Sequence, residues 1–264
     1  MSEDTKVDLF RIYIGDPYEV TEKIKIYQPT LRDVADFGES DFWSFVVRFA
    51  GNPTTMRVAL WDSGVDWCKI KDYDLFVSLI PTFTLDRTCL FFGDLDFTRF
   101  YPVYTEREEV KNDKTVTVRD CTLIHLDDPD IILNEEIYWK MMRGIRTILD
   151  FHPRNHYGKG KTTRQVIIDG DKADAAFKAK QNKDKAFEES DLVRQVSFVL
   201  NSSGFTGTLD DIMSMTYFQF TDCVNRLQAT EHTIALLHGI NVGMIDTKEI
   251  KGLDKKLDLV KSLY

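Results

Sequence analysis

The residues best suited to chemistry are the glycines and lysines of residues 158–163, which read Gly-Lys-Gly-Lys-Thr-Thr. Gly160-Lys161-Thr162 matches the end of a phosphate-binding P-loop, in which backbone N–H groups and a lysine hold phosphate oxygens. Such a loop needs an earlier glycine, a preceding strand and a following helix. Asn155 occupies that glycine position, residues 151–154 make a poor strand, and residues 164–168 favour a strand. The sequence therefore predicts a flexible basic loop here, and nucleotide binding is the third functional hypothesis.

The five histidines do not have the spacing of a metal site. His152 and His156 are four residues apart, but Pro153 disrupts the helix that would align them. His232 and His238 are six residues apart, so on a helix they point to different faces. With His125 isolated and no HExxH pattern present, we expect solvated or core-edge histidines and no metal.

Carboxylates cluster in pairs and triplets that could serve glycoside hydrolysis or metal binding. Each cluster flanks a predicted helix or turn, so we expect helix capping instead. The clusters are Asp62/Asp66, Asp72/Asp74, Asp94/Asp96 and Asp127/Asp128/Asp130. Neither a GxSxG nucleophile elbow nor a GxGxxG dinucleotide motif occurs. We therefore expect a protein that is not an enzyme and takes no cofactor.

Composition favours a cytoplasmic globular protein. The chain has 264 residues, of which 43% are hydrophobic and 29% charged. Its four cysteines, at 68, 89, 121 and 223, form no CxxC pair and are predicted to be buried free thiols. The acidic start lacks the apolar segment of a signal peptide, and the apolar run at residues 75–80 is too short to span a bilayer. We expect no membrane association.

Charge is spread unevenly along the chain. The net charge of −9 argues against nonspecific nucleic-acid binding, because phosphates repel an acidic surface. Residues 151–185 nevertheless carry nine Lys or Arg against four Asp, a net +5. This segment is either a solvated connection or a docking loop for an acidic partner.

Hydrophobic periodicity predicts a helix-rich α+β fold with a first domain over residues 1–130. Residues 11–14 and 24–27 alternate like the strands of a hairpin. Helical spacing predicts helices at 30–37, 41–49, 54–61, 72–80 and 84–92. Residues 97–126 are predicted to form a long hairpin with its tip at 111–114.

Residues 131–264 are predicted to form a mainly helical domain that contains the basic, flexible segment 151–185. Helices are expected at 133–150, 191–200, from 208, at 216–237 and from 246 or 247 to 264. One short strand is expected at residues 165–169, which are rich in β-branched side chains.

Short strings spread over most of the chain resemble a family of proteins encoded among the tail genes of tailed phages and prophages of Gram-positive bacteria. They are IYQPTLRDV (26–34) with FGE (37–39), WDSGVD (61–66), YDLF (73–76), NSSGF (201–205), FTDCVNRL (220–227) and GINVGMIDTK (239–248). The resemblance implies tail morphogenesis, as a tail-assembly chaperone that coats the tape-measure protein before the tube polymerises. It implies no catalytic residues.

The residues are compatible with that role, because a chaperone for a long apolar client needs apolar surfaces and enough charge to stay in solution. The candidate partner-binding residues are two apolar stripes (Phe42, Phe45, Phe49 and Phe220, Val224, Leu227) and four cations (Arg154, Lys159, Lys161, Arg164). Core packing is the alternative for both stripes. A structural neck or tail component of the virion is the alternative function, and a homo-oligomer stays open.

Overall fold

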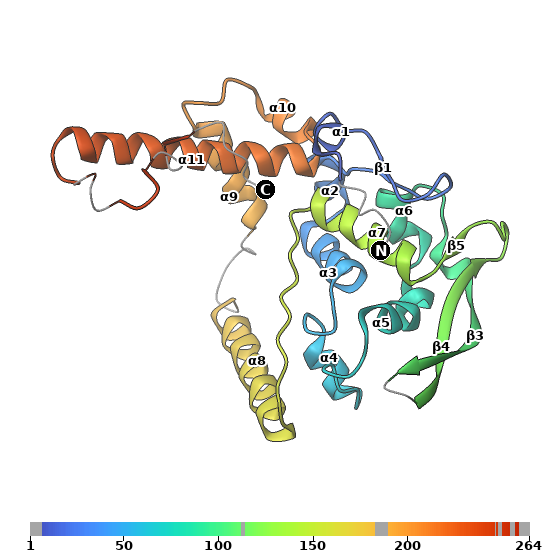
Figure 1. Cartoon of the computed structure of the whole chain (residues 1–264). Helices are drawn as coiled ribbons and strands as arrows, with labels where there is room; N and C mark the ends of the chain where they lie inside the picture. Colours follow the sequence, from blue (N-terminus) through green and yellow to red (C-terminus); the bar gives the residue numbers. More distant parts are fainter. Residues whose placement is uncertain are drawn as a thin grey trace. The chain divides into compact units, whose positions relative to one another are not determined.

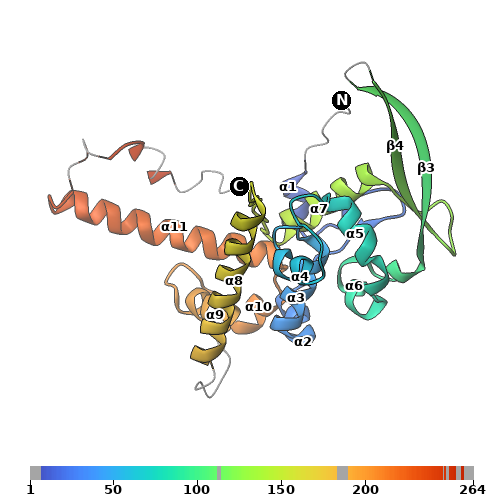
Figure 2. The same ribbon diagram turned by 90° about the horizontal axis from the view of Figure 1, so that it is seen from below.

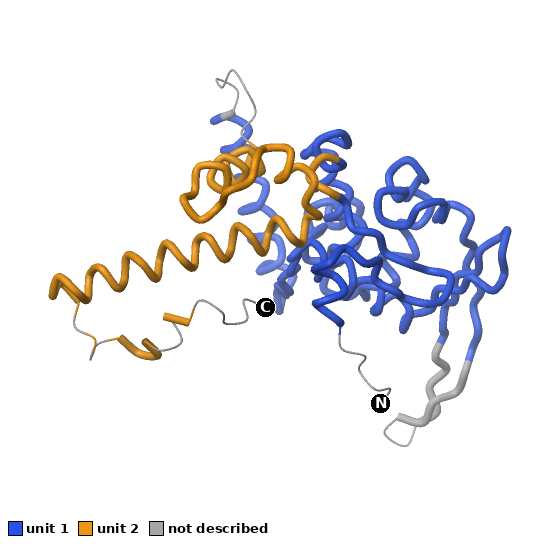
Figure 3. The backbone as a smooth tube through the Cα atoms, turned by 90° about the horizontal axis from the view of Figure 1, so that it is seen from above, with its two compact units in different colours: residues 1–29, 33–189 blue, residues 30–32, 190–264 orange. Residues whose placement is uncertain are grey.

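The computed structural model describes residues 7–111, 114–182, 190–245, 247, 250–253 and 257–258, without the side chains of residues 107–118 and 182. Contacts divide the chain into two units (Figure 3). Unit 1 contains residues 1–29 and 33–189, and unit 2 contains residues 30–32 and 190–264. The boundary predicted between residues 130 and 131 lies inside unit 1, because the helix that follows it contributes to the core of that unit.

Unit 1 is built mostly from short helices (Figure 1). They are α1 (Leu9–Tyr13), α2 (Leu31–Phe37, which begins in unit 2), α3 (Glu39–Ala50), α4 (Arg57–Asp62), α5 (Asp72–Leu79), α6 (Leu85–Phe92), α7 (Glu135–Ile148) and α8 (Lys161–Asn182), with 3-10 turns η1 (Ile80–Thr82) and η2 (Phe97–Arg99). The predicted helices of residues 30–92 are confirmed, since Pro, Gly and acidic first turns delimit them as the sequence indicates.

Phenylalanine rings fill the centre of unit 1. Phe49 of α3 has 2% of its surface exposed, and its ring centroid lies 4.8–5.4 Å from five other phenylalanine rings: Phe45, Phe76, Phe83, Phe92 and Phe97. The five rings come from α3, α5, α6 and the turns around η1 and η2. Such contacts stabilise the fold beyond the burial of the rings alone, so this ring cluster holds these five elements together.

Two small antiparallel sheets complete unit 1. β1 (Tyr18–Glu19) pairs with β2 (Lys25–Ile26), and β3 (Phe100–Lys111) pairs with β4 (Lys114–His125), which also pairs with β5 (Ile132–Leu133). The predicted long hairpin is confirmed. Because β5 contacts β4 only at Leu123 and Ile124, most of β3 and β4 forms a two-stranded ribbon that projects from the helices (Figure 2).

Two strand predictions are wrong. Leu9–Tyr13 forms helix α1, because the Asp8 carboxylate accepts hydrogen bonds from two N–H groups of its first turn. Residues 165–169 lie inside the 22-residue helix α8, whose later part is rich in the strong helix formers Ala, Lys and Gln. The β-branched run was therefore overridden by the rest of the helix.

Unit 2 contains α9 (Asp191–Asn201), α10 (Leu209–Ser214) and the 25-residue α11 (Tyr217–Asn241). Thr208 and Thr216 each form a capping box, which confirms the helix starts predicted there. The terminal helix expected after residue 246 lies largely outside the described residues. Within the described part of the chain, no helix is both long and apolar enough to cross a membrane.

Candidate functional site

An extended segment, the strap (residues 151–160), links α7 to α8 in unit 1. Three side chains donate hydrogen bonds to alternate carbonyls of the strap. Asn52 Nδ2 lies 3.4 Å from the Arg154 oxygen, Trp67 Nε1 3.1 Å from that of His156, and Arg164 Nε 2.8 Å from that of Gly158. These hydrogen bonds hold the strap backbone in place. They therefore also fix the Cα positions from which its exposed basic side chains extend.

Helix α8 packs on α4 and the loop after it through Ile168, the half-buried Ile167 and three charged residues. Ile168 is fully buried in the Trp67 cluster, which we define as Leu60, Trp67, Leu75 and Ile168. Around it, Arg164 pairs with Asp66, Asp171 with Arg57, and Lys172 with Asp62. The α8 residues of these contacts are Arg164, Ile168, Asp171 and Lys172. They follow helical spacing, so they share one face of the helix.

The sequence analysis missed this docking face because a search for apolar periodicity ignores charged residues. The carboxylates Asp62 and Asp66 were expected to cap helices. Asp66 does accept a local hydrogen bond from the Cys68 N–H at 3.1 Å, but both carboxylates also form ion pairs with α8, about a hundred residues further along the chain. The pattern that could have predicted this docking face is the run of opposite charges at helical spacing on α8.

An open hollow of about 600 Å³, the strap hollow, lies between the strap, the start of α4 and α8. Its lining includes Thr54, Thr55, Arg57, Arg154, His156 and Asp171. Arg57 binds Asp171 in a bidentate manner, with 2.5 Å from Nε to Oδ2 and 2.6 Å from Nη2 to Oδ1. The hydrogen bond from Arg57 lowers the pKa of Asp171, so this carboxylate stays ionised.

The four basic candidate residues divide into two groups. Arg154, Lys159 and Lys161 are exposed, and among the described residues none of their charged groups contacts a carboxylate. Arg164 is different, because its side chain is only 17% exposed and pairs with Asp66. Arg164 therefore fixes α8 on the body of unit 1, and it is not a free cation for a partner.

Residues 158–163 share one structural feature with a P-loop, namely the helix that follows the glycines. Lys161 does begin α8, which corrects the expectation of a strand there. The strap that precedes it is not a strand, and Asn155 still occupies the glycine position. A Cβ added at Gly158 would lie 2.7 Å from Arg164 Cγ. Close packing against Arg164 therefore accounts for Gly158 without a phosphate.

The apolar candidate residues are mostly core residues. Phe42, Phe45 and Phe49 are at most 3% exposed in unit 1, and Phe220 and Val224 are 0% and 6% exposed in unit 2. Leu227 is half-buried. Packing in the core, the alternative stated for both stripes, describes these side chains, and in this fold they offer a partner little surface.

The C-terminal end of α11 extends beyond α9 and α10 (Figure 1), and it carries several exposed apolar side chains. Ile234 is 61% exposed, Leu237 40%, Val242 51% and Met244 85%, and we call these four residues the α11 tip. The chain turns back here, since the N–H groups of Met244 and Ile245 both donate to the Gly239 carbonyl at 3.0 and 3.2 Å. The absence of a side chain at Gly239 admits Ile245 against the helix. The sequence analysis missed the tip, because it treated the whole apolar face of α11 alike.

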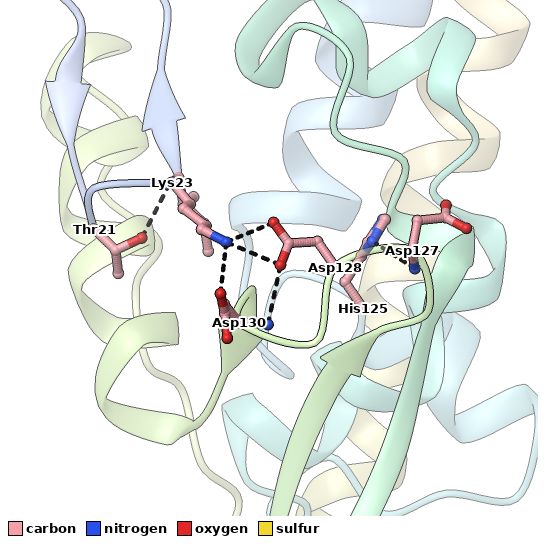
Figure 4. A network of polar contacts seen from close by, with 7 residues as sticks. Thr21, Lys23, His125, Asp127, Asp128 and Asp130 are labelled. Carbon is pink, nitrogen blue, oxygen red and sulfur yellow. Dashed lines mark hydrogen bonds and ion pairs between the residues drawn. The ribbon is translucent and has the colours of Figure 1, made fainter.

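The acidic loop after β4 is a structural site. Figure 4 shows Lys23 between Asp128 and Asp130, with Nζ at 2.6 Å and 3.1 Å from their carboxylates. The buried His125 ring accepts a hydrogen bond from the Asp127 N–H at its Nδ1. Within the described residues, no group of three or more His, Cys, Asp or Glu side chains is arranged to hold a metal. Asp128 Oδ1 also accepts the Asp130 N–H at 3.1 Å, so these carboxylates close the loop by ion pairing as well as by the local capping expected of them.

The four cysteines are free thiols, but they are less buried than predicted. Cys89 is exposed, and Cys68, Cys121 and Cys223 are half-buried. Burial raises the pKa of Cys121 and of Cys223, which keeps both as protonated thiols. Cys121 and Cys223 are therefore better suited to packing than to nucleophilic attack.

A family model matches the C-terminal part of the chain. Residues 180–252 match the model of the YomV second domain, a domain of a phage- or prophage-type protein family. This stretch covers most of unit 2, so the C-terminal part of the chain resembles a phage-type domain and supports a phage-associated protein. No curated protein and no solved structure matches the chain.

Proposed function

We propose that this protein acts in phage tail morphogenesis as a tail-assembly chaperone that binds the tape-measure protein, and that it is not an enzyme. The phage-type match over residues 180–252 supports a phage-associated role. The α11 tip supports the activity, because it is an apolar surface on a chain with a net charge of −9. A client with long apolar helices could pack against such a surface while the charge keeps the complex in solution.

The observation that carries the proposal is the contrast between the two halves of α11. In the first half Tyr217, Phe218 and Phe220 are buried, so that half belongs to the core of unit 2. Beyond α9 and α10, Ile234 lies on the same side of the helix as Phe220 and Val224 but is 61% exposed. Several exposed apolar side chains at one end of a helix are typical of an interaction site.

The structural alternative also has an observation in its favour. The ribbon of β3 and β4 has twelve residues in each strand, so it extends for about 40 Å, and β5 covers only its base. An isolated two-stranded ribbon is marginal in water and leaves unpaired edges for another chain. A neck or tail component of the virion could bury such a ribbon between subunits.

Affinity capture from cells in which the phage is replicating tests the proposal. We expect the tagged full-length chain to capture the tape-measure protein and to be absent from purified particles. Ile234→Glu combined with Leu237→Glu should reduce that capture about tenfold or more, because charges would face the apolar client. Val193→Glu on α9 is the matched control, because Val193 is 66% exposed and also lies in unit 2.

Two results would contradict the chaperone role. Stoichiometric amounts of the protein in finished particles would favour the structural alternative. Equal capture of the tape-measure protein by the α11 double variant and by wild type would show that the tip is not the binding surface. Melting temperatures close to that of wild type would establish that both variants are folded.

A further inference from the structure

We infer that the strap hollow of unit 1 binds a small phosphate-bearing molecule. The hollow has the volume of a small-molecule site, about 600 Å³. Its lining combines apolar surface with polar and charged side chains, and basic residues come from both the strap and α4. This function is independent of the α11 tip, which lies in unit 2.

The charge of the hollow favours an anion. Both oxygens of the Asp171 carboxylate are already engaged by Arg57, so this acidic group is neutralised. Arg154 pairs with no carboxylate among the described residues, and it leaves the lining with a surplus positive charge. Lys159 and Lys161 follow on the exposed side of the same segment. The hollow is therefore a local positive site on an acidic protein.

The donors of the hollow come from the strap, from Thr54 and from the start of α4, so more than one segment could bind the oxygens of one phosphate. Arg154 and His156 project from the strap, whose backbone is fixed by Asn52 and Trp67. Next to the strap, Thr54 is 6% exposed and its Oγ1 accepts the His156 N–H at 3.2 Å. No acceptor in the described part of the chain takes the hydroxyl proton of Thr54, so that proton can be donated into the hollow.

Arg57, the first residue of α4, adds further hydrogen-bond donors to the hollow. A guanidinium carries five N–H groups, and Asp171 takes one from Nε and one from Nη2. The remaining groups can bind a phosphate oxygen while the ion pair keeps the side chain in position. This arrangement uses side chains of the strap and α4. It differs from a P-loop, which would use the backbone around Gly158–Lys161.

Isothermal titration calorimetry on the full-length chain tests the inference, with inorganic phosphate, tripolyphosphate and ATP as probes at constant ionic strength. We expect saturable one-to-one binding of at least one of the three probes. Arg154→Ala should weaken it about tenfold or more, because the free fork-shaped donor is lost. Arg154→Lys should recover part of the affinity, since it keeps the charge without the fork.

Lys180→Ala is the matched control. Lys180 is an exposed cation of α8 that does not line the hollow, so its removal changes the net charge equally. We expect it to change affinity by about twofold or less, as for a remote surface charge. If Arg154→Ala and Lys180→Ala weaken probe binding equally, the attraction is a general effect of net charge, and the proposed site is wrong. The absence of saturable binding for all three probes, or tighter binding of citrate than of any phosphate, would also overturn the site.

Discussion

Arg57 and Asp171 are 114 residues apart in the chain, yet their side chains form two parallel hydrogen bonds of 2.5 and 2.6 Å. This pair joins the first residue of α4 to the middle of α8, and it forms one wall of the strap hollow. A long-range pair with this geometry is a structural clamp, because each partner satisfies the charge of the other.

Asp171→Asn tests the clamp. The pKa of Asp171 is lowered in the folded protein, so its contribution to the free energy of unfolding is present above the ordinary aspartate pKa of about 3.9 and is lost as pH falls through the lowered value. We expect the variant to lose about 1 kcal/mol at neutral pH and to show a flatter decline in acid. Urea unfolding at pH 7 and in the acid range measures both. Asp174→Asn, at an exposed position of α8, should behave like wild type.

Ile168→Ala should release α8 from the body of unit 1. Ile168 is fully buried in the Trp67 cluster and is the only fully buried apolar residue of α8 within its described side chains. Its truncation should cost about 2–4 kcal/mol of docking free energy. Limited trypsin digestion should then cut faster after Arg154 and Lys159 in the strap. Val166→Ala is the control, since Val166 is 65% exposed on the same helix, and equal digestion of the two variants would contradict the docking.

Phe49→Ala should be the most destabilising of these changes in unit 1. It removes a ring that contacts five others, and deletion of a buried aromatic side chain costs about 3–5 kcal/mol. Phe10→Ala is the matched control, because Phe10 is 71% exposed and should change stability by about 0.5 kcal/mol or less. Thermal unfolding followed by circular dichroism measures both. Similar melting temperatures for the two variants would show that the ring cluster is not the core.

Thr216→Ala should loosen the start of α11. The Thr216 hydroxyl accepts the Gln219 N–H, and the Gln219 side chain accepts the Thr216 N–H at 3.0 Å. Loss of an N-cap costs about 1 kcal/mol. Amide hydrogen exchange should show faster exchange in the first turn of α11, while Thr230→Ala in its interior leaves that turn unchanged. Unchanged protection in Thr216→Ala would argue against the capping box.

The candidate sites were only partly predictable. Arg154, Lys159 and Lys161 were identified as exposed basic residues of one segment, and the structure places Arg154 at the strap hollow. Thr54 and Arg57 were not identified, because nothing local relates them to residues about a hundred positions later. The α11 tip was not identified either, since apolar spacing along a helix does not reveal where its covering helices end.

The sequence by itself determined the helix-rich α+β class, the helices from α2 to α7, the long hairpin and the two capped helix starts in unit 2. These features depend on local periods, turn residues and caps, which act within a few residues. Only the tertiary structure decided that residues 165–169 belong to a helix, that Phe42 and Phe49 are core, and that Arg164 is an ion-pair partner of Asp66. Those outcomes depend on burial and charge pairing between segments far apart in the chain, and no local pattern encodes which segments meet.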